Sequence, residues 1–208
     1  MIKEEGKEKE TQTFTGFLRK FFNQPLNQIG ARLVGWGINA NLITAIGFAG
    51  TAAGAVLVSQ GKLLAGGLVI GAMGALDALD GAVARAAGET SLFGAFLDSV
   101  CDRYSELAIY TGIGWYFLGS GNQLGVLLSF LAACGSVLVS YTRARAEGLG
   151  MGAKVGILTR VERMIVIMPA LILNLPLLGV GIVAVLANVT AFQRILHVWQ
   201  QAMKEDEA

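Results

Sequence analysis

Two long apolar segments joined by one short turn decide the fold of this chain. Residues 63–118 read LLAGGLVIGAMGALDALDGAVARAAGETSLFGAFLDSVCDRYSELAIYTGIGWYFL. Each half is at least as long as the stretch of about 20 mainly apolar residues that a helix needs to cross a lipid bilayer. The Gly-Glu-Thr-Ser turn at 88–91 separates the two halves. The stretch therefore predicts two antiparallel membrane helices that carry several charged side chains.

The composition of the whole chain also favours a membrane protein. Of the 208 residues, 54% are apolar and 15% are charged, whereas a soluble domain carries about 25% charged residues. The mean hydropathy is +0.59, and such an apolar chain is not a disordered one. The net charge of +1 gives no basic field for nucleic acid, so we expect no nucleic-acid partner.

Hydropathy predicts an all-α integral membrane fold with six transmembrane helices. Of the 16 Lys and Arg residues, Lys62 alone falls in a loop on the outer side. The positive-inside rule places the opposite side in the cytoplasm, so we expect a multi-pass protein of the cell (plasma) membrane with both termini in the cytoplasm. The predicted spans are 42–58, 63–86, 92–118, 124–141, 164–174 and 178–196.

Three regions are predicted along the chain. Residues 1–41 form a cytoplasmic N-terminus, whose first 12 residues lack the apolar core of a signal peptide. Within it, residues 13–37 mix aromatic and aliphatic side chains with basic ones, which is typical of an amphipathic helix lying on the membrane surface. Residues 42–200 form the six-helix membrane domain, and residues 201–208 form a polar C-terminal tail.

Four aspartates inside the second and third predicted spans are the candidate functional residues. Asp77 and Asp80 share one helix face, as do Asp98 and Asp102, because they are three and four residues apart. A charge at the bilayer centre costs about 2.5–3.5 kcal/mol on insertion scales and usually faces a partner or a cavity. Four carboxylates brought together need cations to stay ionised. Ligands that offer only oxygen favour Mg²⁺, Mn²⁺ or Ca²⁺ over zinc.

Arg85 lies two helical turns after Asp77 and is suited to neutralising a phosphate. Metal ions, carboxylates and an arginine together suggest two-metal phosphoryl chemistry. The same residues are also compatible with three alternatives. The acids could form buried packing bridges with Arg85 and Arg103, they could line the pathway of a cation transporter, or the chain could be a lipid-binding scaffold without activity.

The spacing of these residues resembles the signature of the CDP-alcohol phosphotransferase family of integral membrane enzymes. The resemblance implies an enzyme that transfers a substituted phosphate from a CDP-linked lipid to an alcohol and releases CMP. It also favours a homodimer embedded in membrane lipid. The matching residues are Asp77-x-x-Asp80-Gly81-x-x-Ala84-Arg85, eight residues, then Gly94-x-x-x-Asp98-x-x-x-Asp102.

The resemblance implies a role for each matching position. Asp102 would be the general base that takes the proton of the acceptor hydroxyl. The ligands of Mg²⁺ (or Mn²⁺) would be Asp77, Asp80, Asp98 and Asp102. The contacts with the CDP-linked lipid would come from Asn41, Leu42, Ile43, Thr44, Gly81, Arg85 and Ser91.

Five arginines on the predicted cytoplasmic side favour an acceptor that already carries a phosphate, because arginine binds phosphate through two parallel hydrogen bonds. Plain positive-inside charge would also place arginines on this side. These candidate residues for binding the acceptor phosphate are Arg143, Arg145, Arg160, Arg163 and Arg194.

The segments around these arginines, at 140–147, 160–163 and 193–199, resemble those of bacterial phosphatidylinositol phosphate synthases. This resemblance implies that CDP-diacylglycerol reacts with inositol phosphate to give phosphatidylinositol phosphate and CMP. Glycerol phosphate is the alternative acceptor, as in phosphatidylglycerophosphate synthase. An archaetidylinositol phosphate synthase differs mainly in its lipid tails, which the sequence does not reveal.

Overall fold

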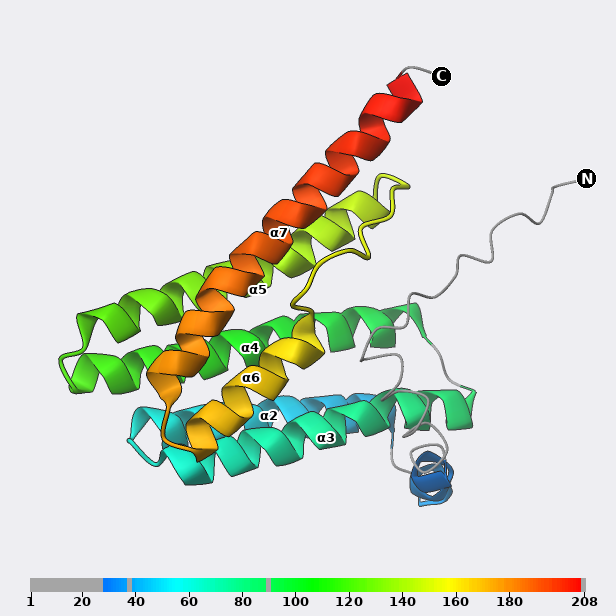
Figure 1. Cartoon of the computed structure of the whole chain (residues 1–208). Helices are drawn as coiled ribbons and strands as arrows, with labels where there is room; N and C mark the ends of the chain where they lie inside the picture. Colours follow the sequence, from blue (N-terminus) through cyan, green and yellow to red (C-terminus); the bar gives the residue numbers. More distant parts are fainter. Residues whose placement is uncertain (1–27, 37–38, 89–90, 207–208) are drawn as a thin grey trace, which may run out of the picture.

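A computed structural model describes residues 28–36, 39–88 and 91–206, and most of this part of the chain is helical (Figure 1). It contains no strand, so the predicted all-α fold is confirmed for the described residues. Residues 28–35 are also helical, but most of the predicted surface helix at 13–37 lies outside the described residues. The helices are α2 (Ala40–Ser59), α3 (Leu63–Ala87), α4 (Leu92–Gly119), α5 (Gln123–Glu147), α6 (Arg160–Ile172) and α7 (Pro176–Asp206).

Four of these helices, α2, α3, α5 and α7, are long and apolar enough to cross a membrane. Helix α4 has 28 residues, but it carries a charged segment between Asp98 and Glu106. Helix α6 has 13 residues, and a helix of this length is shorter than the hydrocarbon core of a bilayer is thick, which is about 30 Å. The structure therefore fits a membrane protein with several apolar helices, and the count of six spans stays a prediction.

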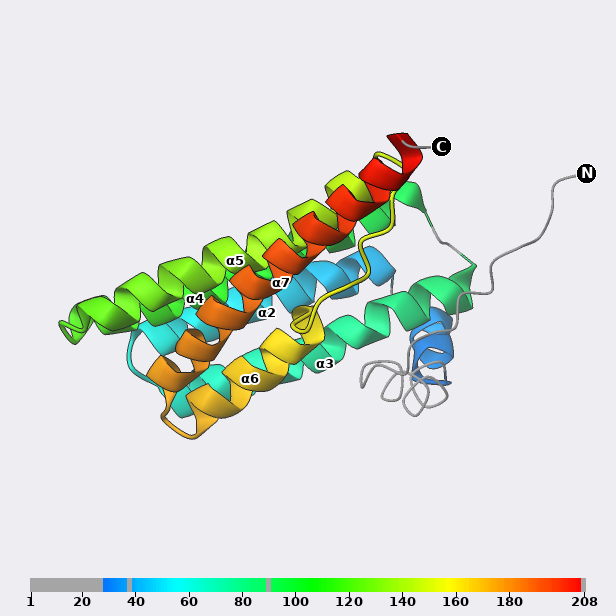
Figure 2. The same cartoon turned by 45° about the horizontal axis from the view of Figure 1, so that its top comes forward.

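The main helix contacts join both consecutive and non-consecutive helices. Helix α2 packs against α3 and α4, α4 packs against α5, and α5 packs against α7. Helix α6 contacts α3 on one side and α7 on the other, and it lies between them in Figures 1 and 2. Gly112 permits the close approach of α4 to α2, because a Cβ at this position would collide with the carbonyl of Ala55. This packing places one end of α6 beside the charged segment of α4.

Side chains and a glycine define the helix ends nearest the predicted site. Asn39 is the N-cap of α2, and its side chain accepts a hydrogen bond from Asn41 N at 2.8 Å. Helix α3 ends at Gly88, whose φ of 66° is in the left-handed region that favours glycine. Ser91 begins α4 and accepts a hydrogen bond from Gly94 N at 2.9 Å. These ends bring the start of α2, the end of α3 and the start of α4 to the same end of the bundle.

The residues between the fourth and fifth predicted spans, 142–163, are helical at both ends of the stretch. Helix α5 continues to Glu147 and α6 begins at Arg160, so residues 148–159 alone connect the two helices. An exposed ion pair of 2.8 Å between Arg143 and Glu147 supports the last turn of α5. Hydropathy predicts that the span ends at 141, whereas α5 continues to Glu147, and the ion pair stabilises this added turn.

Three side chains of α7, those of Thr190, Arg194 and Gln201, bind this connection. They lie on one face of the helix, because positions four and eleven residues apart return to the same face. All four hydrogen bonds are made to the main chain of the connection. They run from Leu158 N to Thr190 Oγ1 (3.1 Å), from Arg194 Nε to Val155 O (2.9 Å), and in both directions between Gly152 and Gln201 (3.2 and 2.6 Å).

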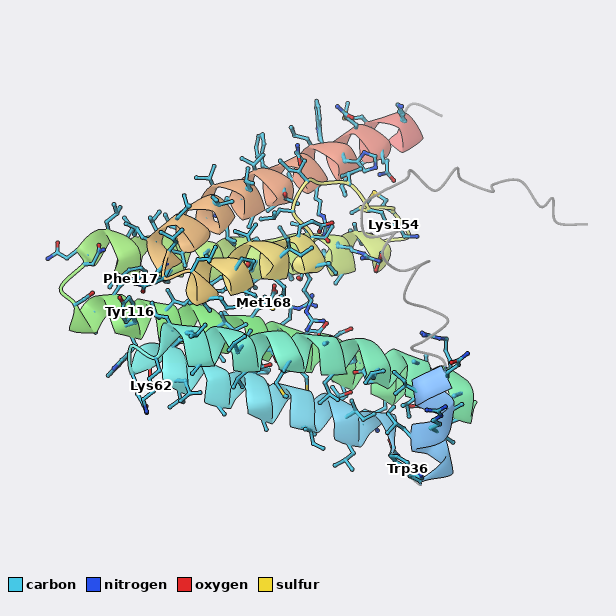
Figure 3. The ribbon with its side chains drawn as sticks, turned by 60° about the horizontal axis from the view of Figure 1, so that its bottom comes forward. Trp36, Lys62, Tyr116, Phe117, Lys154 and Met168 are labelled. Carbon is cyan, nitrogen blue, oxygen red and sulfur yellow. The ribbon has the colours of Figure 1, made fainter. Side chains whose placement is uncertain are left out.

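Release of this connection is measurable by trypsin cleavage at Lys154, an exposed residue of the connection that Figure 3 labels. Gln201→Ala removes two hydrogen bonds, which are worth about 0.5–1.5 kcal/mol each. We therefore expect limited proteolysis after Lys154 to become at least about threefold faster, because cleavage follows the population of the open segment. The matched control is Gln200→Ala on another face of α7, and equal cleavage rates in the two variants would contradict the tether.

Candidate metal and phosphate site

Three of the four predicted aspartates lie close together. Asp77 on α3 and Asp98 and Asp102 on α4 each place one carboxylate oxygen within 4.8 Å of the others. The four-residue spacing directs Asp98 and Asp102 from one face of α4 toward α3. We call these three residues the carboxylate cluster. The antiparallel helix pair predicted from residues 63–118 therefore brings its acids together.

Asp80, the fourth aspartate, turns toward α2. Its Oδ2 accepts a hydrogen bond from Thr44 Oγ1 at 2.8 Å, and its Oδ1 accepts one from Gly81 N. Asp80 is buried, and it borders the same pocket as Asp98. Its carboxylate is therefore next to the carboxylate cluster and fixed by α2.

Arg160, the first residue of α6, neutralises part of the carboxylate cluster. Its Nη1 lies 2.8 Å from Asp77 Oδ2, and its Nη2 lies 2.7 Å from Asp102 Oδ1. Arg103 adds a contact of 3.2 Å between its Nη2 and Asp102 Oδ2. Together with Asp80, four carboxylates face these two guanidiniums. The site therefore keeps an excess of negative charge.

A second ion pair joins α4 and α6 one helical turn further on. Arg163 Nε and Nη2 donate to Glu106 Oε1 and Oε2, each at 2.8 Å, and Arg163 Nη1 donates to Leu158 O at 3.2 Å. Arg163 and Glu106 are 1% and 2% exposed. We call the Asp102–Arg160 and Glu106–Arg163 pairs the ion-pair ladder. The ladder sets the position of α6 against α4.

A pocket of about 240 Å³ opens beside Asp80 and Asp98, where α2, α3 and α4 meet. Gly81 leaves room for Arg85, because a Cβ at Gly81 would lie 3.3 Å from Arg85 Nη1. We call this space the polar pocket. Four of the seven residues predicted to contact the CDP-linked lipid line it, namely Thr44, Gly81, Arg85 and Ser91.

The other three predicted contacts, in the first turn of α2, lie outside this lining. Ile43 is buried in the core, and Leu42 is 52% exposed. Asn41 lies close to the polar pocket, since a Cβ on Gly94 would come 2.9 Å from Ser91 Oγ and 3.3 Å from Asn41 Oδ1. Gly94 thus allows the starts of α2 and α4 to approach each other.

A larger pocket of about 600 Å³ opens beside Asp77 and Arg160, between α2, α3, α4 and α6. We call it the apolar pocket, and Figure 3 labels one of its α6 residues, Met168. The carboxylate cluster thus borders both pockets. The apolar side chains in the lining include Ile70, Met73, Ile109, Met164, Ile165 and Met168.

The five arginines predicted to bind an acceptor phosphate differ in their partners, although Arg143 and Arg163 both lie within electrostatic reach of Arg194. Arg160 contacts the carboxylate cluster and Arg163 contacts Glu106, as described above. Arg194 is 3% exposed and donates to the main-chain oxygens of Val139 and Val155. The side chains that face solvent are those of Arg143 and Arg145, near the end of α5.

Glu106 was not among the site residues predicted from the sequence, although its spacing carries a signal. Glu106 follows Asp102 by four residues, and Arg163 follows Arg160 by three. Two acids on one face of a helix can form two neighbouring ion pairs with two arginines on one face of another helix. What local spacing does not reveal is that the fold brings the first turn of α6 within ion-pair distance of this face of α4.

The fold and site define a class of protein: a helical membrane protein whose clustered carboxylates lie between a polar and an apolar pocket. The profile of the CDP-alcohol phosphatidyltransferase family matches residues 38–202. The chain therefore belongs to this family of enzymes, as the spacing of its aspartates predicted.

Relatives with assigned names extend the similarity over most of the chain. The archaetidylinositol phosphate synthase of Pyrococcus horikoshii is 44% identical over 181 residues, which cover 86% of this chain and 93% of the relative. The phosphatidylinositol phosphate synthase of Streptomyces avermitilis is 34% identical over 208 aligned positions, covering 92% and 85%.

The fold is similar to crystal structures of the phosphatidylinositol phosphate synthase of Mycobacterium tuberculosis. The form with CDP-diacylglycerol (CDP-DAG) bound matches with a TM-score of 0.77 and 32% identity, covering 84% of this chain and 93% of that one. The form with manganese and citrate matches with a TM-score of 0.78 and 31% identity, covering 84% and 88%.

The ladder predicts that Arg163→Met lowers stability strongly, because Glu106 would stay buried without a partner. Breaking such a buried pair costs about 3–5 kcal/mol, so we expect a clearly lower Tm in detergent. The control is Arg143→Met, which breaks an exposed pair worth about 1 kcal/mol or less. Adding Glu106→Leu to Arg163→Met should restore part of the loss. Equal Tm values for the two single variants would contradict the role of the ladder.

Proposed function

We propose that this chain transfers the phosphatidyl group of CDP-diacylglycerol to inositol phosphate, giving phosphatidylinositol phosphate and CMP. The observation that carries the proposal is the position of the carboxylate cluster between the polar and the apolar pocket, where both parts of an amphiphilic nucleotide substrate find space. The named relatives support inositol phosphate as the acceptor, because both kinds of synthase are named for a product with an inositol phosphate headgroup.

The donor set fits a divalent cation. The cluster offers oxygen atoms alone, and one oxygen of each carboxylate lies within 4.8 Å of the others. Such ligands suit Mg²⁺ or Mn²⁺, which Asp77, Asp98 and Asp102 would hold with Asp80 alongside. When bound, the cation would neutralise the diphosphate and stabilise the charge that develops on departing CMP. The choice between Mg²⁺ and Mn²⁺ is left to experiment.

The two pockets suit the two ends of the donor lipid. Thr44, Gly81, Arg85 and Ser91 line the polar pocket, which we assign to the CDP group. The methionine and isoleucine side chains of the apolar pocket suit a hydrocarbon chain. This arrangement holds the diphosphate beside the carboxylate cluster.

Asp102 is the proposed general base. Arg103 contacts its carboxylate at 3.2 Å, which orients Asp102 at the edge of the cluster. Asp102 would take the proton from the acceptor hydroxyl as that oxygen attacks the lipid-bearing phosphorus. The bond from this phosphorus to the bridging oxygen then breaks, and CMP leaves with that oxygen.

The acceptor would approach from the end of the bundle where Arg160 begins α6. We place this end at the cytoplasmic face of the plasma membrane, in accord with the positive-inside rule. Arg160 is the member of the predicted acceptor set that touches the carboxylate cluster. Arg143 and Arg145 would add positive charge nearby that attracts an anionic acceptor.

We also propose that the enzyme works as a homodimer.

A second candidate function differs in the lipid. The relative from Pyrococcus horikoshii is an archaetidylinositol phosphate synthase at 44% identity, which favours a donor with archaeal lipid chains. The acceptor and the chemistry are the same in both candidates, and the apolar pocket suits either kind of chain.

A competition assay tests the acceptor and the lipid. Purified protein with Mg²⁺ receives inositol phosphate, glycerol phosphate, serine and unphosphorylated inositol together, with either CDP-diacylglycerol or CDP-archaeol. Mass spectrometry of the lipid product should show phosphatidylinositol phosphate as the main product, because arginines select an acceptor that carries a phosphate. A preference for an uncharged alcohol would contradict the proposal, and a preference for CDP-archaeol would favour the second candidate.

Replacement of the base tests the chemistry. Asp102→Asn should lower kcat by about 10²–10⁴-fold, the usual contribution of a general base. The protein should still elute as a single species and bind CDP-diacylglycerol, since the polar pocket is unchanged. Unchanged turnover would contradict the role of Asp102 as the base, and lipid binding without any turnover in the unsubstituted protein would favour a lipid-binding scaffold. Metal-coupled cation flux in liposomes without CMP release would favour a transporter.

A further inference from the structure

Arg160 contacts the same oxygens that the proposed function assigns to a cation. Its two terminal nitrogens lie 2.8 Å from Asp77 Oδ2 and 2.7 Å from Asp102 Oδ1. A carboxylate oxygen that coordinates Mg²⁺ lies about 2.0–2.1 Å from it, and a guanidinium held against the same oxygen would bring two positive charges into contact. Arg160 and the cation therefore compete for Asp77 and Asp102.

The two arginines of the ion-pair ladder differ in their freedom to move. Arg163 is 1% exposed and donates to both oxygens of Glu106 and to Leu158 O. The side chain of Arg160 is 28% exposed, and its Nε has no hydrogen-bond partner. Arg160 is also the first residue of α6, directly after the connection at 148–159. The side chain of Arg160 is therefore partly open to solvent and makes fewer hydrogen bonds, whereas that of Arg163 is enclosed.

We propose that Arg160 exchanges between two partners, the carboxylate cluster and the phosphate of the acceptor. Arg160 leaves Asp77 and Asp102 when these carboxylates coordinate the cation, and it then binds the anionic acceptor. This inference rests on the proposed function, because it takes the cation and the phosphorylated acceptor from it. The same residue thus couples the two sites: the acceptor binds more tightly when the cation is present, and by linkage the cation binds more tightly when the acceptor is present.

The exchange has a consequence that a fixed structural bridge lacks. Without Arg160, the carboxylates lose their competitor, so the affinity for a cation should rise. A fixed bridge predicts the opposite, because its loss disorders the carboxylates and weakens any cation site. Binding of Mn²⁺ therefore distinguishes the two roles without any measurement of turnover.

The experiment measures the Kd for Mn²⁺ from the electron paramagnetic resonance signal of free Mn²⁺, using the full-length protein in detergent. Arg160→Gln should bind Mn²⁺ at least about tenfold more tightly. This gain in affinity is small compared with the interaction energy of two unit charges about 4 Å apart near a protein surface. The Kd of Arg160→Lys for Mn²⁺ should lie between those of the unsubstituted protein and Arg160→Gln, since a lysine does not bridge two carboxylates as an arginine does. The control Lys154→Gln removes the same charge from an exposed position nearby and should stay within about twofold of the unsubstituted protein, as expected for a screened charge.

The coupling is tested by repeating the titration with inositol phosphate present. The unsubstituted protein should bind Mn²⁺ more tightly with inositol phosphate than without it, and Arg160→Gln should lose most of this difference. Unchanged or weaker Mn²⁺ binding by Arg160→Gln, in protein that elutes as the unsubstituted form does, would overturn the exchange. Undiminished coupling in that variant would overturn it as well. If the unsubstituted protein bound no Mn²⁺ at all, the proposed function itself would fail.

Discussion

The buried ion pair between Glu106 and Arg163 is the constraint on which the rest of the site depends. Both side chains are almost fully enclosed, and a buried charge is tolerated when its partner and its hydrogen bonds are in place. Helix α6 packs against α3 and α7, and this pair links it to the charged face of α4. Because Arg160 is one turn away on the same helix, the pair also determines where that guanidinium meets Asp77 and Asp102. A contact outside the carboxylate cluster therefore shapes the cluster.

The site combines two demands that an apolar helix bundle rarely meets together. It concentrates negative charge near the membrane, and it leaves space on both sides of that charge. Small residues meet the second demand: Gly81 makes room for Arg85, and Gly94 lets the starts of α2 and α4 approach. In the proposed complex, the carboxylates lie beside the diphosphate that joins the nucleotide to the lipid. This geometry gives a physical reason why the family signature contains glycines as well as aspartates.

Much of this was predictable from the sequence, and the failures have clear physical reasons. Hydropathy located α2 to α4 within about two residues, because lipid enforces long apolar runs. It ended the fourth span at 141, whereas α5 continues to Glu147, since a helix stabilised by a charged pair outside the bilayer leaves no hydropathy signal. The spacing of Asp77, Asp98 and Asp102 predicted their meeting. The bonds of Asp80 to Thr44 and of Arg194 to main-chain oxygens depend on packing between distant segments, which local spacing does not encode.

The chain belongs to the CDP-alcohol phosphatidyltransferase family, and the proposed mechanism joins two phosphorylated substrates at one carboxylate cluster. The most direct test of this mechanism is the stoichiometry of the reaction. Purified protein is incubated with CDP-diacylglycerol and inositol phosphate, and CMP and the lipid product are quantified by mass spectrometry, with and without a chelator of divalent cations. The mechanism predicts one phosphatidylinositol phosphate for each CMP, and neither product when the chelator is present or the acceptor is omitted. CMP release that is independent of the acceptor, or product formation in the presence of excess chelator, would contradict it.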